Sequence, residues 1–327
     1  MAAVPLLFIL SVVSFGLIHS LPGDPVEAMM GGNTRDIDPS ELAYIRHEFG
    51  IDQPLPKQYF AWLKGFVGHG ELGRSYQDNR KVLVVIGERI PATITLVGLA
   101  LVLSFTLGIF WGLCMVAVRM KLRSTIIEAP LVVSALIIYS CPAFFIGLML
   151  IYIATFNPQL HCLPLFGSLS PKEIPGPIAL LKYAALPALT LGINRSAKIA
   201  LYVRSLALDE VTRSYVTTAL AKGLSIPQVM FHHVAKNCMV PVINLAALSL
   251  PALIGGSVLI ETIFAWPGTG RLAVEATFGR NFPVMTTLVM IYGTMVVLSN
   301  LVADIVQTLV DPRLADDGDN LNSAQKS

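Results

Sequence analysis

DEVTRSYVTTALAKGLSIPQVMFHHVAKNCMVP, residues 209–241, is a polar stretch between two long apolar blocks of the chain. In its first part apolar side chains recur every fourth residue, at Val211, Tyr215 and Ala219, which predicts a helix that ends near residue 222. This helix is expected to begin at Asp209–Glu210, because negative charge is favoured at a helix N-terminus.

A stop and a new start follow within this stretch. Gly223 can end the first helix, because glycine adopts the left-handed conformation that closes many helices. Ser225–Gln228 then begins a second helix: serine caps, proline fits the first turn, and glutamine three residues after serine completes a capping box. The pattern predicts a helix, a sharp turn and a second short helix.

The composition identifies the class of protein. Hydrophobic residues make up 54% of the chain and charged residues 13%, whereas charged residues make up about a quarter of a soluble domain. We therefore predict a polytopic membrane protein whose first partner is the lipid bilayer. The net charge of +2 indicates no nucleic-acid partner, and the scattered cysteines predict neither a disulfide framework nor a metal site.

Apolar blocks of roughly the 20 residues needed to cross a bilayer divide the chain. The first block could also be a cleaved signal peptide, but it lacks a basic start and a small-residue cleavage site, so we expect a retained span. The predicted parts are a first transmembrane helix 1–20, an extracytoplasmic region 21–91, a five-helix core 92–310 and a tail 311–327. The six apolar blocks are Ala2–Ser20, Ala92–Val118, Ile126–Phe156, Ile178–Leu208, Met239–Phe264 and Val284–Val310.

Basic residues in the short connections predict the orientation. Arg119, Lys121 and Arg123 cluster between the second and third spans, whereas the connection Asn157–Pro177 carries only one lysine and one glutamate. Because lysine and arginine are enriched in cytoplasmic loops, the first of these connections, and with it residues 209–241, is expected in the cytoplasm. Six spans then leave both termini and the tail 311–327 on the cytoplasmic side.

Tyr215–Leu224, followed by His233, Asn237 and Pro241, resembles the EAA loop of ABC-importer permeases, in the variant of the dipeptide, oligopeptide and nickel importers. The first, acidic position of that motif is Thr217 here, and its usual arginine is Leu220. In that family the loop is the coupling helix that docks on a separate ATPase subunit. The resemblance implies an ATPase-coupling role for Asp209, Glu210, Tyr215, Thr218, Ala219, Lys222, Gly223, Leu224, His233 and Asn237.

Further segments resemble the same permeases in the same order. They are Leu21–Pro25 (LPGDP), Gly50–Tyr59 (GIDQPLPKQY), Gly70–Ser75 (GELGRS), Glu261–Leu272 (ETIFAWPGTGRL) and Asp311–Arg313 (DPR). The resemblance therefore extends from residue 21 to residue 313. It implies an all-α polytopic membrane protein of the type I ABC-importer permease fold, with six transmembrane helices and an exported N-terminal insertion, in the bacterial cytoplasmic (inner) membrane.

The resemblance also implies the partners and the cargo. A second homologous permease subunit, expected as a heterodimer, would complete the pathway, two ABC ATPase subunits would drive it, and an extracytoplasmic binding protein would deliver peptides, nickel or metal chelates. No phosphate-binding loop of the G-x-x-x-x-G-K-[ST] type is present. We therefore expect no catalytic residue and no cofactor in this chain, with ATP and magnesium bound by the partner subunits.

Two pairs of residues in the chain could bind ligands. His232–His233 is a poor metal pair, because adjacent residues point to different sides of a helix, and we predict no metal site there. Arg195 and Lys198 lie three residues apart in the fourth apolar block. Either the span ends before them and they are cytoplasmic charges on a helical extension, or they line the pathway and favour an anionic substrate.

Small residues occur in two of the apolar blocks. Small residues at Gly108, Gly112 and Gly255–Ser257 are expected to permit close approach of helices.

The alternative function is a secondary transporter or channel driven by an ion gradient, a class that often has inverted repeats and intramembrane carboxylate relays. Uptake that persists after inactivation of the ATPase would indicate this alternative.

Overall fold

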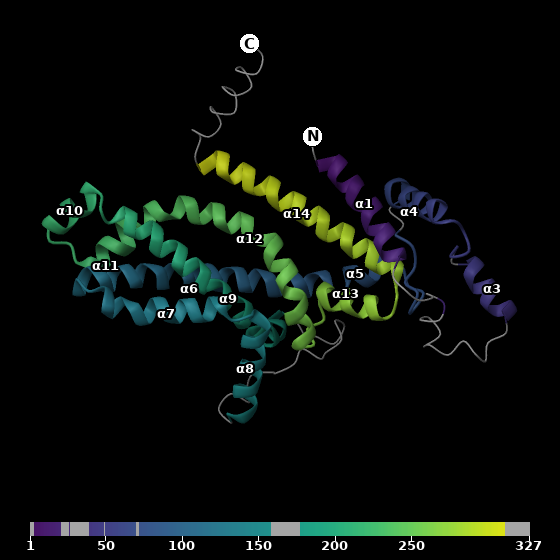
Figure 1. Cartoon of the computed structure of the whole chain (residues 1–327), viewed down its shortest axis with the longest axis horizontal. Coiled ribbons are helices and arrows are strands. Elements are labelled where there is room, and N and C mark those ends of the chain that lie inside the picture. The colour runs from purple at the N-terminus through teal and green to yellow at the C-terminus, as the bar shows by residue number, and fades with distance from the viewer. Residues whose placement is uncertain are drawn as a thin grey trace, which may run out of the picture.

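A computed structural model of the chain shows a helical protein extended along one axis (Figure 1). The predicted tail 311–327, most of the connection Asn157–Pro177 and part of the region 21–91 lie outside the residues that the structure describes. Within the described residues the regular structure is helical, apart from a β-bridge between Arg74 and Lys81. The described residues are 3–20, 26, 39–48, 50–69, 72–157 and 177–310.

Two long helices form the centre of the molecule, α6 (Ile90–Leu122) and α9 (Pro177–Glu210), which lie against each other over most of their length. Glycines on α6 permit this contact. A Cβ atom on Gly108 would lie 2.7 Å from Cβ of Ile199, and one on Gly112 would lie 2.6 Å from a backbone oxygen of α9. Carbon atoms pack at about 3.5–4.0 Å, so the predicted close approach at these two glycines is confirmed.

The third apolar block forms two helices, α7 (Thr125–Ser140) and α8 (Ala143–Phe156), whose axes differ by 103°. Pro142 stands at the break, where its ring and its missing N–H prevent a continuous helix. Asn194 of α9 donates from Nδ2 to two carbonyl oxygens at the end of α7, at 3.2 and 2.8 Å. The break is therefore supported by a neighbouring helix.

The fifth and sixth blocks form α12 (Ala235–Ile263) and α14 (Phe282–Val310), joined through the short helix α13 (Thr269–Phe278). The helical path that contains α12 bends by 53° just before Pro251. A Cβ atom on Gly255 or Gly256 would meet no atom within 4 Å. The expectation that these two glycines make a close helix contact is therefore wrong within this subunit, because both lie on an exposed face of α12.

The first helix, α1 (Ala3–His19), lies along α14, with Leu10 seated against Gly293. By length and composition, Val82–Leu122 and Phe282–Val306 can cross a membrane, and the number of such stretches rises from two to four if each bent pair is one span. The apolar stretch of α1 is shorter, and polar side chains interrupt α9. Membrane crossing by these two helices stays a prediction.

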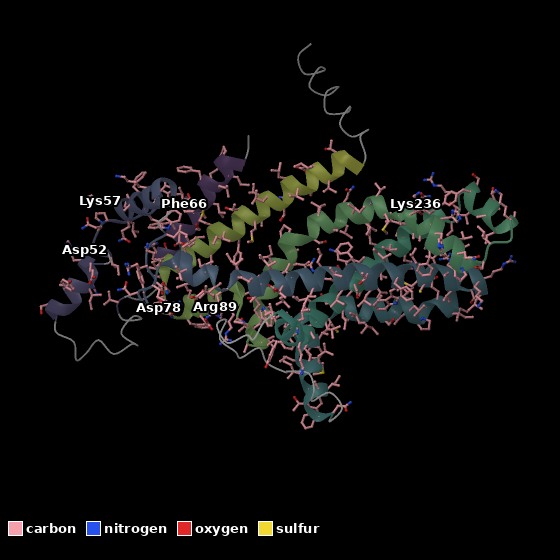
Figure 2. All side chains as sticks on the ribbon, turned by 180° about the vertical axis from the view of Figure 1, so that it is seen from behind. Asp52, Lys57, Phe66, Asp78, Arg89 and Lys236 are labelled. Atoms are coloured by element: carbon pink, nitrogen blue, oxygen red, sulfur yellow. The ribbon has the colours of Figure 1, made fainter. Side chains whose placement is uncertain are left out.

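The predicted extracytoplasmic region lies at one end of the molecule and the segment 209–241 lies near the other (Figure 1). The first end contains α3 (Pro39–Glu48) and α4 (Leu55–His69). In Figure 2, Asp52 and Lys57 mark this end, and Lys236 marks the opposite one.

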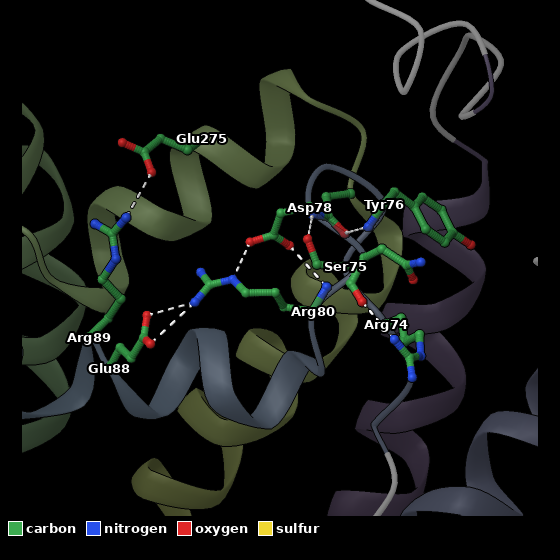
Figure 3. A network of polar contacts seen from close by, with 10 residues as sticks. Arg74, Ser75, Tyr76, Asp78, Arg80, Glu88, Arg89 and Glu275 are labelled. Carbon is green, nitrogen blue, oxygen red and sulfur yellow. Dashed lines mark hydrogen bonds and ion pairs between the residues drawn. The ribbon is translucent and has the colours of Figure 1, made fainter. Parts of the chain in front are cut away.

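The loop before α5 (Val82–Gly87) binds the turn between α13 and α14 (Figure 3). Asn281 in that turn is buried, donates to the hydroxyl of Ser75 at 2.9 Å and accepts the backbone N–H of Tyr76 at 3.1 Å. This amide thus joins parts of the chain about two hundred residues apart. Figure 3 also shows Arg80 between Asp78 and Glu88, and Arg89 beside Glu275.

Candidate functional site

The predicted first helix of the segment 209–241 is divided in the structure. Asp209 and Glu210 belong to the C-terminal end of α9, a turn follows, and a separate helix α10 (Ser214–Ala221) begins after it. The expectation that the acidic pair begins a helix is wrong. A carboxylate at a helix C-terminus is electrostatically unfavourable, so the position of Glu210 requires other partners.

Those partners lie on three parts of the segment. One carboxylate oxygen of Glu210 accepts the hydroxyl of Tyr215 at 2.8 Å and Nδ2 of Asn237 at 3.2 Å. The other lies 3.1 Å from Nε of Arg213. Burial and the hydrogen bond to Glu210 raise the pKa of Tyr215. Glu210 therefore ties the end of α9 to α10 and to the first turn of α12.

The turn after α10 has the predicted chemistry. Gly223 has a φ of +86°, and its N–H and that of Leu224 donate to carbonyl oxygens of α10 at 3.0 and 3.3 Å, as in a Schellman motif. The capping box of Ser225 and Gln228 is present, with the backbone N–H of Ser225 donating to Oε1 of Gln228 at 3.0 Å. Both predictions are confirmed.

The second helix of the segment is not short. The three-residue helix α11 (Ile226–Gln228) continues into a π-helix, η2 (Val229–Val234), and then into α12 without a break. A π-helix is rare and often lies at a functional site. Because Met230 and Val234 are fully buried, tertiary packing stabilises the wider turn, and a displacement of α11 would pass directly into α12.

The residues predicted to couple to an ATPase fall into three groups. Glu210, Tyr215 and Asn237 form the polar cluster at the helix junction. Ala219 and the partly buried Leu224 pack inward, against the core that α6, α9 and η2 share. The remaining residues are exposed, and they are Asp209, Thr218, Lys222, Gly223 and His233.

Arg195 and Lys198 lie on the side of α9 that faces away from α6. Arg195 is half-buried and Lys198 is exposed, and in the described part of the chain neither forms an ion pair or a hydrogen bond. The exposed Tyr202 and Ser205 continue the same face at helical spacing, whereas Ile199, which packs on Gly108 of α6, is buried. Within this subunit, α9 therefore presents an open cationic face.

The sequence analysis missed the role of Glu261, a fully buried residue of α12. One of its oxygens accepts the hydroxyls of Thr93 and Ser257 at 3.0 and 3.1 Å. The other accepts the backbone N–H groups of Gly270 and Arg271 at 2.7 and 3.1 Å. A carboxylate followed by two closely spaced glycines was the available signal, because glycines permit close backbone approach.

The surrounding contacts enclose this carboxylate. A Cβ atom on Gly268 would lie 2.3 Å from Oε2 of Glu261. The buried Trp266 donates from Nε1 to the carbonyl oxygen of Ala92 at 3.0 Å. Tyr292 of α14 donates to the hydroxyl of Thr269 at 3.2 Å, and that hydroxyl lies 3.1 Å from the hydroxyl of Thr93. Glu261 thus joins α6, α12, α13 and α14 in one junction.

A second buried carboxylate, Glu128 of α7, pairs with Arg204 of α9. Arg119 at the end of α6 lies 3.7 Å from its other oxygen. Arg204 is therefore a buried-pair residue and not a solvated charge, because its side chain neutralises a carboxylate that is only 2% exposed.

Paired long helices, two bent apolar helices and a polar helical loop at one end are the features of an ABC-importer permease. The fold is similar to that of a chain from the MetNI methionine ABC transporter in an inward-facing conformation. That comparison has a TM-score of 0.56 and covers 70% of this chain and 97% of that one. The sequences are 17% identical, so this similarity shows the fold alone.

The chain belongs to the family of binding-protein-dependent transport system inner membrane components, which it matches over residues 104–316, with the N-terminal part of that family matched over residues 1–97. A putative peptide permease protein of Brucella suis is 34% identical over 94% of this chain and 95% of its own length. The di/tripeptide transport system permease protein of Pseudomonas aeruginosa is also 34% identical, over 95% of each chain.

The chain is therefore the inner-membrane permease component of an ABC transporter, and ATP hydrolysis resides in separate subunits. Membership implies ATPase and binding-protein partners. It also decides against the alternative of an ion-gradient-driven transporter. The relatives compared here are named for peptides, and they give nickel no specific support.

Proposed function

We propose that this chain forms one half of the membrane pathway of an ATP-driven peptide importer, and that residues 209–241 dock on an ATPase subunit in the cytoplasm. The main observation is the helical loop itself, which Glu210 holds to both α9 and α12. The peptide permeases that match nearly the whole chain support peptides as the cargo.

Basic residues support this orientation. Arg119 and Arg123 line the same cavity as Leu208 and Val211, so the basic connection between α6 and α7 lies beside the start of the candidate coupling segment. Lysine and arginine favour the cytoplasmic side. Both termini and the tail 311–327 are then cytoplasmic, and α3 and α4 belong to the extracytoplasmic region.

The open face of α9 supports a second, homologous permease subunit, with which this chain would form a heterodimer. Two ABC ATPase subunits would bind ATP and magnesium, and an extracytoplasmic binding protein would deliver the cargo. Nucleotide binding would shift the importer from the inward-facing to the outward-facing state only through its unequal affinity for the two states. The continuous path from α11 through η2 to α12 would carry the loop's displacement into the membrane.

The charge reversal Lys222→Glu tests the coupling role. Lys222 is exposed at the end of α10, and its reversal is expected to weaken ATPase docking by about 1–3 kcal/mol, since like-charge contacts at interfaces are costly. Co-purification of the ATPase and peptide uptake by the assembled transporter are the measurements. Lys57→Glu, at the other end of the molecule (Figure 2), is the matched control. Normal docking and uptake in Lys222→Glu would overturn the coupling role.

We propose in addition that Arg195 and Lys198 line the pathway and favour acidic peptides. Cations in membrane-spanning helices usually face a bundle interior or an aqueous cavity, and these two have no counter-ion among the described residues. The double variant Arg195→Ala/Lys198→Ala is expected to reduce uptake of acidic peptides by about tenfold and of neutral peptides much less. Lys182→Ala, which removes an exposed cation from the same helix, is the control. Equal uptake of both peptide classes by variant and wild type would exclude this role.

A further inference from the structure

A cavity of about 310 Å³ lies between the α6–α7 turn and the C-terminal end of α9. Half of its lining residues are polar or basic and half are apolar. The polar half consists of Arg119, Arg123, Ser124 and Thr125, and the apolar half of Val116, Met120, Leu208 and Val211. The cavity is therefore amphipathic.

Positive charge exceeds negative charge around this cavity. Arg119 and Arg123 line the cavity, whereas none of its lining residues in the described part of the chain is acidic. Of the carboxylates beside it, Glu128 is bound more closely by Arg204 than by Arg119, which lies 3.7 Å away, and Glu210 pairs with Arg213. Arg123 is exposed and has no ion pair among the residues that the structure describes. The charged groups that line the cavity are thus two guanidinium groups, and an anion would be attracted to them.

The surface beside the cavity is strongly apolar. Ile126 is 80% exposed and Ile127 is 50% exposed, in the first turn of α7, and Leu122 at the end of α6 is 47% exposed. In a membrane protein such side chains face the hydrocarbon of the bilayer. The cavity therefore lies where apolar side chains give way to basic ones, the pattern expected where a membrane protein meets the phospholipid headgroups.

We propose that this cavity binds one anionic phospholipid, whose phosphate lies between Arg119 and Arg123 and whose acyl chain follows Met120 and Ile126. Basic pockets between helices at the cytoplasmic membrane surface suit such headgroups. Inorganic phosphate shares the anionic chemistry, but it would leave the apolar half of the wall without a ligand. This site goes beyond the proposed transport function, because lipid binding does not require residues 209–241 to dock on an ATPase.

Native mass spectrometry of the purified, assembled transporter tests the proposal. Phosphatidylglycerol and phosphatidylcholine are added in turn to wild type, Arg123→Gln and Lys121→Gln. Lys121 is exposed on the same turn but does not line the cavity, so its variant is a matched control for lost charge. We expect Arg123→Gln to weaken phosphatidylglycerol binding by about tenfold, the effect of losing one charge-assisted contact, and Lys121→Gln to weaken it by less than about twofold.

Four outcomes would overturn the lipid site. Equal losses in the two variants would indicate general surface charge, and equal binding of phosphatidylcholine would exclude an anion site. Inorganic phosphate that displaces phosphatidylglycerol at equal concentration would assign the cavity to free phosphate. The same spectra report the ATPase subunits, so release of those subunits from Arg123→Gln, with lipid still bound, would assign Arg123 to subunit docking instead.

Discussion

Two carboxylates at opposite ends of the bundle connect helices in different ways. Glu261 is fully buried and accepts four hydrogen bonds, two of them from backbone N–H groups. The side chain of Glu210 is 18% exposed, and one of its partners, Asn237, is an exposed residue. A hydrogen bond open to water contributes little net free energy, whereas a buried donor left unpaired costs about 1–3 kcal/mol. The Glu261 junction is thus expected to stay closed while the Glu210 junction can open.

The largest effect should come from Glu261→Gln. The amide nitrogen would face donors, so at least one buried N–H or hydroxyl loses its acceptor, and we expect a loss of about 3 kcal/mol or more in the free energy of unfolding. Thermal unfolding of the purified transporter in detergent measures it. Glu275→Gln is the matched control, because Glu275 is 37% exposed and, among the described residues, pairs with two arginines. Equal unfolding temperatures in the two variants would contradict the view that the Glu261 junction is the more strongly bonded of the two junctions.

A smaller effect is expected from Gly268→Ala. Its Cβ atom would overlap the Glu261 carboxylate, and overpacking of this kind typically costs about 1–3 kcal/mol. Gly255→Ala adds the same methyl group in α12 where it meets no atom within 4 Å, so its unfolding temperature should be unchanged or slightly raised. A Gly268→Ala variant as stable as Gly255→Ala would show that the loop around Glu261 can move aside.

The smallest effect on stability is expected from Tyr215→Phe. This variant removes one partner of Glu210 and should lower the free energy of unfolding by less than about 1 kcal/mol, since water can replace the hydroxyl. ATPase activity stimulated by the peptide-loaded binding protein is the second measurement, and we expect it to fall although the transporter remains assembled. Tyr44→Phe, at an exposed site on α3, is the control. Destabilisation as large as that of Glu261→Gln would place the two junctions in the same class.

Local signals predicted the parts of the candidate site that depend on neighbouring residues. The stop at Gly223 and the capping box of Ser225 and Gln228 require only backbone conformation and side chains three residues apart. The helix boundary before α10 could not be predicted in this way. The acidic pair Asp209–Glu210 satisfies the rule for a helix start, but α9 continues through it because Glu210 finds partners on α10 and α12.

By itself, the sequence determined the class of protein, the order of the apolar helices and the chemistry of the turn after α10, because composition and short-range spacing carry that information. Only the tertiary structure decided that α11 continues through a π-helix into α12 and that Glu261 finds its donors on α6 and α13. Both depend on groups distant in the chain: a buried core supports the wider turn, and the hydroxyl of Thr93 donates to a carboxylate 168 residues away. A buried polar group must find its partners wherever packing brings them, and that is a property of the folded chain.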